Sequence, residues 1–493
     1  MKVKRIPPLI AAMLFVTLAV VWADAQGMPK RRPPGKAPKA HAVVFPPEVA
    51  KLRTLSLVLG RPTDKSVVVN VLSAETREGY IEYGSDERRL VTRTVLTKFP
   101  ANTPVDIALE KLERNTRYFY RLQSRKPGEA AFVADTLHSF HTQRAPGSTF
   151  TFQIQGDSHP ERPQMFDPSL YAQTLRAVAA DRPDFYMTIG DDFSIDQPIP
   201  ADAEAVRQVY LRQRYYLGLA AHSSPLFLVN GNHDLGTDGT PKNIVDLARI
   251  TRNAFFPQPA PDRFYTGDAK LVEPVGLLRD YFAWTWGDAL FVVIDHYSHS
   301  PASAGKPRGG GGQRDLWAMT LGDEQYRWFK KTLEESKAKY KFVFAHHVLG
   351  TGRGGIEMAG LFEWGGKNRK GIDEFSRQRS TWELPIHRLM AKNGVTIFFQ
   401  GHDHLFAHQQ LDGVVYQELP VPADPNYALS DWASAYRTGD ILPNSGRVRV
   451  TVSPEKVRVE CVRSRLVKDA TPAHPDGEIA FRYEIPAKRG SQH

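Results

Sequence analysis

Cysteine is the residue that this sequence most lacks. The chain has 493 residues and one cysteine, Cys461, so it cannot form a disulfide within itself. The fold must then be stabilised by its apolar core or by bound metal. Cys461 lies in the alternating run RVRVECVRSRL, which predicts a small buried residue on a strand.

Long apolar runs are also scarce, and the longest is at the N-terminus. A positively charged start, MKVKR, precedes the run LIAAMLFVTLAVVW of 14 residues, and Ala-Asp-Ala follows it. This order predicts a secretory signal peptide over residues 1–25, removed after Ala25. An uncleaved anchor is the alternative, although the run is short for a membrane span. We therefore expect a secreted or periplasmic protein with no membrane span after removal of the signal.

Positive charge is in excess, but it is concentrated at the N-terminus. The net charge is +10, of which residues 1–25 carry +2 and residues 26–40 carry +5, leaving +3 for the rest. Residues 26–41 are therefore predicted to be an extended, solvated Pro/Lys-rich linker. The remaining chain lacks the basic excess of a nucleic-acid-binding protein, so we predict no nucleic-acid partner other than as a substrate.

Residues 42–145 contain about seven short runs of β-forming residues, separated by turn residues. In the run LERNTRYFYRL, Tyr118 follows Leu112 by six positions. This pattern resembles the tyrosine-corner strand of fibronectin type III-like domains. We predict an N-terminal β-sandwich of the fibronectin III-like type.

From residue 146 onward, apolar strands alternate with helical stretches. Strand and helix in alternation predict an α/β layered domain, which we place at 146–465, with a C-terminal tail at 466–493. Helical spacing occurs at 169–183, 203–220, 323–337 and 383–394. The strands are TFTFQIQ, DFYMTIG, PLFLVN, LFVVID, KFVFA and VTIFF.

Polar side chains directly follow five of these strands. Ligands of α/β sheets bind at the carboxyl ends of strands, so we expect these side chains to meet at one site. Glycines at 156, 190, 231 and 401 let the chain turn tightly there. The side chains are Asp157 and His159 in GDSH, Asp191 in GDDF, Asn232 and His233 in GNHD, His346 and His347 in AHH, and His402 and His404 in GHDH.

Carboxylates and imidazoles in this combination bind transition metals well. The spacings Asp-x-His and His-x-His place both side chains on the same side of an extended segment. Seven ligands are too many for one tetrahedral ion and suit two ions that share a bridge. Two ions about 3.5–4 Å apart can activate a water between them and stabilise an in-line displacement at phosphorus.

The motifs GDSH, GDDF, GNHD, HH and GHDH, in this order, resemble those of the calcineurin-like metallophosphoesterases over residues 148–460. The resemblance implies a four-layer α/β/β/α domain with two divalent or trivalent transition-metal ions (Fe, Mn or Zn) at the strand ends. It implies that His233 assists the leaving group and that Asp234 orients His233. The implied ligands are Asp157, His159 and His404 for one ion, Asn232, His346 and His402 for the other, and Asp191 as the bridge.

A fibronectin-like domain ahead of such a catalytic domain is similar to the layout of plant-type purple acid phosphatases. That group has a tyrosine ligand three residues after the bridging aspartate and a glycine two residues after the first aspartate. This chain has Ser194 and His159 at these positions. Without a tyrosinate ligand, the enzyme is predicted not to be purple.

The predicted function is an exported, phosphatase-like hydrolase of small-molecule phosphate esters that works through a metal-bridging hydroxide. Because the motifs do not separate monoesters from diesters, a phosphodiesterase or nucleotide hydrolase of the same fold is the alternative. A non-catalytic surface-binding protein is disfavoured, since all seven metal ligands are present. The oligomeric state stays open.

Two loops are candidates for the substrate pocket, at 305–315 and 350–371. Arg353, in the second loop, is predicted to contact a phosphate oxygen, with an exposed surface loop as the alternative. His347 either replaces His346 as a ligand or lies beside it as a satisfied or substrate-facing neighbour.

Overall fold

The computed structural model describes residues 44–196, 202–236, 240–301, 316–350 and 352–488. The predicted signal peptide (1–25), the linker (26–41) and the loop at 305–315 lie outside these residues. Within the described ranges, no helix has the length and apolarity needed to cross a bilayer.

The N-terminal part is a sandwich of two sheets, which contains the strands expected there. One apolar cluster joins both sheets, with Leu57 and Val69 from the first and Ile81 and Tyr120 from the second. The Tyr118 hydroxyl accepts a hydrogen bond from the Glu113 backbone N–H (2.9 Å). After helix α1 (Pro47–Lys51), the first sheet has β1 (Leu55–Gly60), β2 (Val67–Ser73) and β6 (Val105–Leu109), and the second has β3 (Arg77–Gly84), β4 (Thr92–Arg93), β5 (Thr97–Phe99), β7 (Arg117–Arg125), β8 (Val133–Ala134) and β9 (His138–His141).

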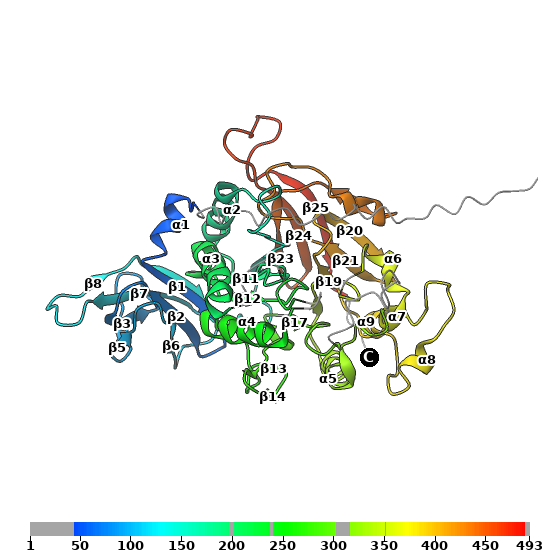
Figure 1. The fold of residues 1–493 in the computed structure, drawn as a ribbon, viewed down its shortest axis with the longest axis horizontal. Helices are drawn as coiled ribbons and strands as arrows, with labels where there is room; N and C mark the ends of the chain where they lie inside the picture. The colour runs from blue at the N-terminus through cyan, green and yellow to red at the C-terminus, as the bar shows by residue number, and fades with distance from the viewer. Residues whose placement is uncertain (1–43, 197–201, 237–239, 302–315, 351, 489–493) are drawn as a thin grey trace, which may run out of the picture. The chain divides into compact units, whose positions relative to one another are not determined.

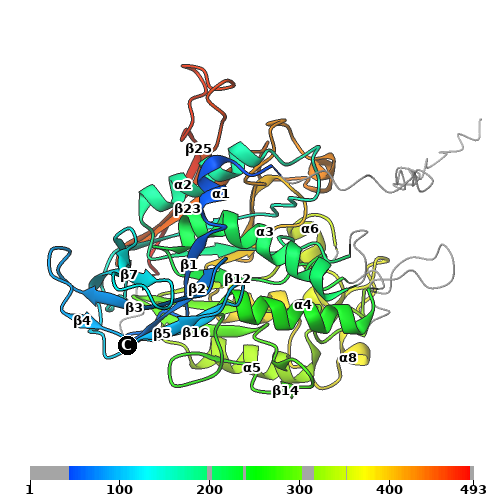
Figure 2. The same cartoon turned by 60° about the vertical axis from the view of Figure 1, so that its left-hand side comes forward.

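Two larger sheets form the centre of the second part. The first is six-stranded, in the order β12-β11-β10-β23-β24-β25, and helices α2, α3 and α4 cover its outer face. Its strands are β10 (Phe150–Gln155), β11 (Phe185–Thr188), β12 (Leu226–Leu228), β23 (Gly446–Val452), β24 (Lys456–Arg463) and β25 (Ile479–Pro486), and its helices are α2 (Pro168–Asp181), α3 (Ala203–Ala221) and α4 (Lys242–Phe255). Figure 2 shows α3 and α4 side by side in front of this sheet.

The second sheet is eight-stranded and is covered on its outer face by α5, α7 and α9 (Figure 1). In sheet order its strands are β13 (Thr266–Gly267), β16 (Phe282–Trp286), β17 (Ala289–Val293), β18 (Tyr340–Phe344), β19 (Ile397–Gln400), β21 (Val414–Glu418), β20 (Phe406–Leu411) and β22 (Asp440–Leu442). Its helices are α5 (Gly322–Glu335), α6 (Ile356–Ala359), α7 (Phe362–Gly365), α8 (Phe375–Gln378) and α9 (Ile386–Lys392), and the strands β14 (Leu271–Val272) and β15 (Gly276–Leu277) form a separate hairpin.

The predicted α/β/β/α layering is confirmed. Between the two sheets lies a dense aromatic core in which Phe152 of one sheet contacts Phe291 of the other at 5.3 Å between ring centroids. Strands such as β12 (LFL) and β17 (ALFVV) are buried on both faces and are therefore continuously apolar rather than alternating. Residues from Val44 onward form one compact unit, so the domain boundary predicted at 145/146 stays a prediction.

Helix α2 shows how local sequence determines these elements. The Asp167 side chain accepts hydrogen bonds from the backbone N–H groups of Ser169 and Leu170, at 2.8 and 2.9 Å, and caps the first turn. The buried face includes Tyr171 and Leu175, at the predicted helical spacing. Arg182 ends the helix in the left-handed conformation.

The prediction of a tail at 466–493 is wrong for its second half. Residues 479–486 form β25, which pairs with β24 in antiparallel register and extends the six-stranded sheet. The run IAFRYEIP alternates, and its apolar residues Phe481, Tyr483 and Ile485 pack against the central core. Residues 464–478 separate this strand from its partner β24 in the sequence.

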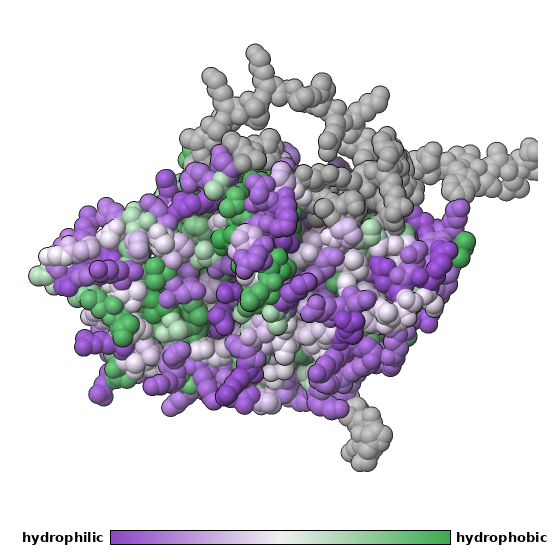
Figure 3. Space-filling model, turned by 60° about the horizontal axis from the view of Figure 1, so that its bottom comes forward, coloured by the Kyte–Doolittle hydropathy of each residue, from purple (hydrophilic) through white to green (hydrophobic). Residues whose placement is uncertain are grey.

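The sandwich and the α/β layers are joined by buried polar contacts. Arg214 of α3 is fully buried and donates to the Ser56 hydroxyl (2.9 Å) and the Asn70 carbonyl (3.0 Å) of the first sandwich sheet, and also to the Phe255 carbonyl. Some apolar side chains of the sandwich remain exposed, among them Val91 and Val95. Figure 3 shows hydrophobic residues as separate patches on a largely polar face.

His222 makes this junction sensitive to pH. Its carbonyl accepts from the Tyr120 hydroxyl (2.6 Å), and its ring lies 4.4 Å from that of His138. Burial, aided by the charge of His138, lowers the pKa of His222 from 6.5 to about 4. Between these values the unfolded chain binds the proton and the folded chain does not, so stability is lost as the pH falls from 6.5 to about 4.

We expect the His222→Gln variant to lose this dependence. Across that pH window, the free energy of unfolding of the unmodified protein should fall by on the order of 1–3 kcal/mol more than that of the variant. Denaturant unfolding at several pH values measures the difference. Parallel curves for the two proteins would contradict the assignment.

Candidate metal centre

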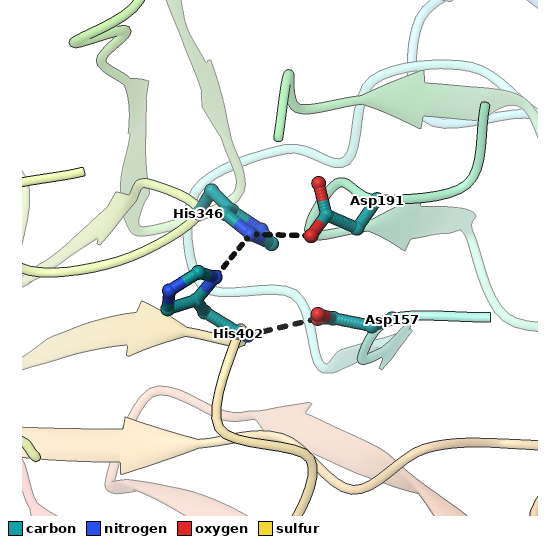
Figure 4. Close-up of side chains that lie close together, drawn as sticks. All are labelled: Asp157, Asp191, His346 and His402. Carbon is teal, nitrogen blue, oxygen red and sulfur yellow. Dashed lines mark hydrogen bonds and ion pairs between the residues drawn. The ribbon is translucent and has the colours of Figure 1, made fainter. Parts of the chain in front are cut away.

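The predicted site residues lie together at the carboxyl ends of the parallel strands. β10, β11 and β12 run parallel in one sheet, and β18 and β19 run parallel in the other. Asp157 and His159 follow β10, Asp191 follows β11, Asn232 follows β12, His346 follows β18, and His402 and His404 follow β19. Figure 4 shows the side chains of Asp157, Asp191, His346 and His402 close together.

The backbone at these positions is unusual. His159, Asp191, His402 and His404 all have positive φ angles, of 43°, 57°, 78° and 56°. Residues with a Cβ rarely adopt this conformation, which costs on the order of 1–2 kcal/mol each. Four such residues around one point indicate that the fold holds them there for function rather than for stability.

Two of the motif glycines are required by the carboxylates themselves. A Cβ on Gly231 would lie 2.2 Å from Oδ1 of Asp191, and a Cβ on Gly401 would lie 2.5 Å from Oδ1 of Asp157. No side chain fits in either place. The glycines of GNHD and GHDH therefore let strand ends from both sheets approach the carboxylates closely.

The first group of side chains consists of Asp157, His159 and His404, whose ligand atoms lie within 4.8 Å of one another. Oδ1 of Asp157 accepts from the His402 backbone N–H (2.9 Å), which leaves Oδ2 facing the imidazoles. Oδ2 lies 3.0 Å from Nε2 of His404 and 3.7 Å from Nε2 of His159. These three residues were predicted to hold the first ion.

The second group surrounds His346. Its Nδ1 bonds to the Ile189 carbonyl (2.9 Å), so Nε2 is free to act as a ligand. Nε2 lies 3.2 Å from Oδ1 of Asn232 and 3.1 Å from Nδ1 of His402. These three residues were predicted to hold the second ion.

Asp191 lies between the two groups. Its Oδ1 accepts from the His233 backbone N–H (2.8 Å). Its Oδ2 is 3.1 Å from Nε2 of His346 and 3.7 Å from Nε2 of His159. One oxygen is therefore placed near a residue of each group, which is the position that a bridging ligand requires.

The chemistry of this donor set fits cations. Asp157 and Asp191 are each 1% exposed, and neither forms an ion pair with a lysine or arginine of the described residues. Although burial opposes it, the neighbouring carboxylates raise the pKa of His159 to about 10 and of His346 to about 9. Nε2 of His159 is buried without a hydrogen-bond partner among the described groups. Metal ions would replace these protons and satisfy this nitrogen.

His233 borders the cluster, with its Nε2 4.0 Å from Oδ2 of Asp191. The expectation that Asp234 orients His233 is corrected by the structure. Asp234 accepts instead from three backbone N–H groups, those of Asp191 (2.8 Å), Phe193 (2.6 Å) and Gly231 (2.7 Å). Asp196 bonds to Nδ1 of His233 at 2.6 Å and takes the orienting position.

Arg162 and Glu161 complete this side of the site, and the sequence did not single them out. Arg162 donates to Nε2 of His233 (2.7 Å), and since arginine is always a donor, this nitrogen is the acceptor. Glu161 accepts from Nδ1 of His159 (2.9 Å) and from the Ser194 hydroxyl (2.7 Å). Ser194, at the position of the purple-group tyrosine, thus supports His159 through Glu161.

His347 and Arg353 both contact Asp403, which is fully buried. Nε2 of His347 is 3.3 Å from Oδ2 of Asp403, and its Nδ1 bonds to the Val348 carbonyl (2.7 Å). Arg353 donates to Oδ1 of Asp403 and to the His402 carbonyl, both at 2.8 Å. Of the two histidines after β18, His346 therefore faces the cluster and His347 does not. Arg353 supports the backbone of His402, and its predicted contact with phosphate stays a prediction.

The only sequence signal for the residues that the prediction missed is their closeness to the motifs, and it is weak. Glu161, Arg162 and Asp196 stand within five positions of a motif residue, but charged residues in loops are usually solvated. Nothing in their spacing separates them from such residues. Asp192 and Asp403, which stand beside motif residues, are 1% and 0% exposed.

Comparisons with known proteins agree with this geometry. Residues 150–406 match the family described as calcineurin-like phosphoesterase. No relative among curated protein sequences matches this chain.

Solved structures show the same fold at low sequence identity. A purple acid phosphatase from yellow lupin (Lupinus luteus) seeds is similar over 87% of this chain and 74% of its own, at 16% identity and a TM-score of 0.57. The structure of PhoD is similar over 91% of this chain and 94% of its own, at 14% identity and a TM-score of 0.60. At such identity the likeness extends to the fold alone.

Proposed function

This chain belongs to the calcineurin-like phosphoesterase family, and we propose that it is an exported, phosphatase-like hydrolase of small-molecule phosphate esters. Family membership implies a metal-dependent phosphoester hydrolase. The proposal adds the export, the substrate class and the roles of individual residues.

One observation carries the proposal. Two buried carboxylates, Asp157 and Asp191, each keep one oxygen held by a backbone N–H and point the other at imidazole nitrogens. We assign Asp157, His159 and His404 to one ion, Asn232, His346 and His402 to the other, and Asp191 to both. Two such ions supply Lewis acidity and lower the pKa of bound water.

The remaining residues serve the substrate. Asp196 holds Nδ1 of His233, so that Nε2 faces the site and could carry a proton to the leaving oxygen once Arg162 donates to the substrate instead. Arg162 already donates to this Nε2 and has a partly exposed side chain (24%). A planar guanidinium suits two phosphate oxygens, so we assign Arg162 to binding of the phosphoryl group.

A paired substrate assay tests the reaction class. We expect hydrolysis of p-nitrophenyl phosphate to exceed that of the bis ester, to stop after treatment with a chelator and to return on addition of a transition metal. Preferential hydrolysis of the bis ester would favour the diesterase alternative. Equal, negligible rates with two ions bound per chain would contradict an esterase of either kind. The same sample, fully loaded, should show no visible band from a tyrosinate ligand.

Arg162 offers a more specific test. A hydrogen bond to a charged group contributes about 1.5–3 kcal/mol, so Arg162→Ala should lower kcat/KM about 10- to 100-fold. Arg162→Lys keeps the positive charge but loses the planar guanidinium that can bond to two phosphate oxygens. We therefore expect a raised KM with little change in kcat. The control is Arg176→Ala, which removes an exposed arginine of α2 that pairs with Glu48. Unchanged KM values in both Arg162 variants would refute the assignment.

Export is tested on the mature protein. N-terminal sequencing of protein recovered from outside the cytoplasm should begin at Gln26, directly after Ala25. Recovery of an intact N-terminus, or retention in the cytoplasm, would refute it.

A further inference from the structure

A second cluster of metal-ligating side chains lies outside the site described above. Asp268 follows β13, Asp280 precedes β16, and His299 lies in the segment after β17. β13 and β16 are antiparallel neighbours, and the Asp268 N–H donates to the Tyr281 carbonyl (3.2 Å), which brings the two aspartates to adjacent strands. Oxygens of both carboxylates and a nitrogen of His299 lie within 4.8 Å of one another.

The hydrogen bonds of these residues leave one oxygen unused. Oδ1 of Asp280 accepts from the Tyr281 N–H (2.8 Å), and its Oδ2 lies 3.0 Å from Nε2 of His299. Oδ1 of Asp268 accepts from the Lys270 N–H (2.9 Å). Oδ2 of Asp268 is buried and has no hydrogen-bond partner among the described residues.

The charges of this cluster do not balance. Asp268 and Asp280 are 2% and 1% exposed, and in the described part of the chain no lysine or arginine forms an ion pair with either. A protonated His299 would neutralise only one of the two carboxylates. A buried carboxylate without a counter-charge is strongly unfavourable, and a bound cation would supply that charge and a partner for the unused Oδ2 of Asp268. Consistent with this deficit, burial and the charge of Asp280 raise the pKa of Asp268.

We propose that Asp268, Asp280 and His299 form a separate binding site for one divalent transition-metal cation such as Zn²⁺ or Mn²⁺. Two carboxylate oxygens and one imidazole nitrogen are a donor set that these ions accept. The partly exposed His299 side chain (23%) leaves a route to solvent. The site does not depend on the proposed reaction.

The position of this site gives the ion a structural role. It links the edge strand β13 and its neighbour β16 to the segment 295–299 that follows β17. At the start of that segment Asp295 accepts from Asn230 at 2.6 Å, and Asn230 lies two positions before the predicted metal ligand Asn232. A cation here would therefore hold the segment 295–299, which contacts the chain next to Asn232 through the Asn230–Asp295 hydrogen bond. Its binding should raise the melting temperature of the protein.

Metal counting on matched variants tests the proposal. After equilibrium dialysis against Zn²⁺, the unmodified full chain should hold one more ion than Asp268→Asn or Asp280→Asn. The control is Glu273→Gln, which removes an exposed carboxylate between the two aspartates and should bind as many ions as the unmodified chain. Because the result is a difference between variants, it is independent of how many ions the catalytic centre takes.

Two outcomes would overturn the site. Equal ion counts in the unmodified chain and in folded Asp268→Asn and Asp280→Asn would show that the three side chains share protons only. Should these variants not fold, anomalous diffraction from crystals of the unmodified protein grown with Zn²⁺ decides the question. A peak among Asp268, Asp280 and His299 supports the site, and no peak there refutes it.

Discussion

The His233→Asn variant is expected to keep two metal ions per chain and to lose about 10²–10⁴-fold in kcat, the effect of removing a general acid. Asparagine preserves the backbone N–H that donates to Oδ1 of Asp191, so the bridging carboxylate should stay in place. It removes the Nε2 that faces the site and the ring that Asp196 orients. Metal content by elemental analysis and kcat on p-nitrophenyl phosphate measure the two effects.

A matched control separates the role of His233 from general damage. His408 lies on β20, which β21 separates from β19, and its ring pairs with Asp440 rather than with a residue of the metal centre, so His408→Asn should keep full kcat. Asp196→Asn should act in the same direction as His233→Asn but less, and should shift the pH profile. A His233→Asn enzyme with normal kcat and two ions would disprove the assignment.

The Asp191→Ala variant should lose both ions and more than about 10³-fold in activity, since metal-ion catalysis contributes several kcal/mol to transition-state stabilisation. The reason is geometric, because Oδ2 of Asp191 lies near His346 of one group and His159 of the other. Removal of a residue that coordinates only one of the two ions should leave the other ion at least partly bound. His404→Ala is such a variant, and it should retain about one ion.

The neighbouring aspartate provides the control for Asp191. Asp192 is equally buried, but its Oδ1 accepts from Gln155 (3.0 Å) and Ser158 (2.7 Å), away from the imidazoles. Asp192→Asn should therefore retain two ions. Two ions per chain in purified Asp191→Ala would disprove the bridge.

The second half of the C-terminal segment shows where a local pattern is insufficient. The alternation in IAFRYEIP is visible in the sequence, but a strand needs a partner. Its partner β24 ends at Arg463, and residues 464–478 separate the two strands. The Asp268–Asp280–His299 cluster could not be predicted from the sequence for the same reason, since its residues come from separate segments that no motif connects. Pairing between distant segments depends on how their apolar faces pack, which adjacent residues do not specify.

The catalytic set was predictable from local order. Each apolar run ends at a glycine or a polar residue, and parallel strands necessarily bring their carboxyl ends to the same edge of a sheet. The sequence alone therefore predicted that Asp157, Asp191, His346 and His402 lie near one another. The alternation of strands and helices predicted an α/β layered domain, and the four layers α/β/β/α followed from the resemblance to the calcineurin-like family.

Orientation within the site was decided only by the folded chain. Of the adjacent histidines after β18, His346 faces Asp191 whereas His347 faces Asp403. Of the two acids near His233, Asp196 and not Asp234 bonds to its ring. Such choices depend on side-chain directions set by positive φ angles and by hydrogen bonds to backbone groups far away in the chain, and neither is encoded in the order of residues within a motif.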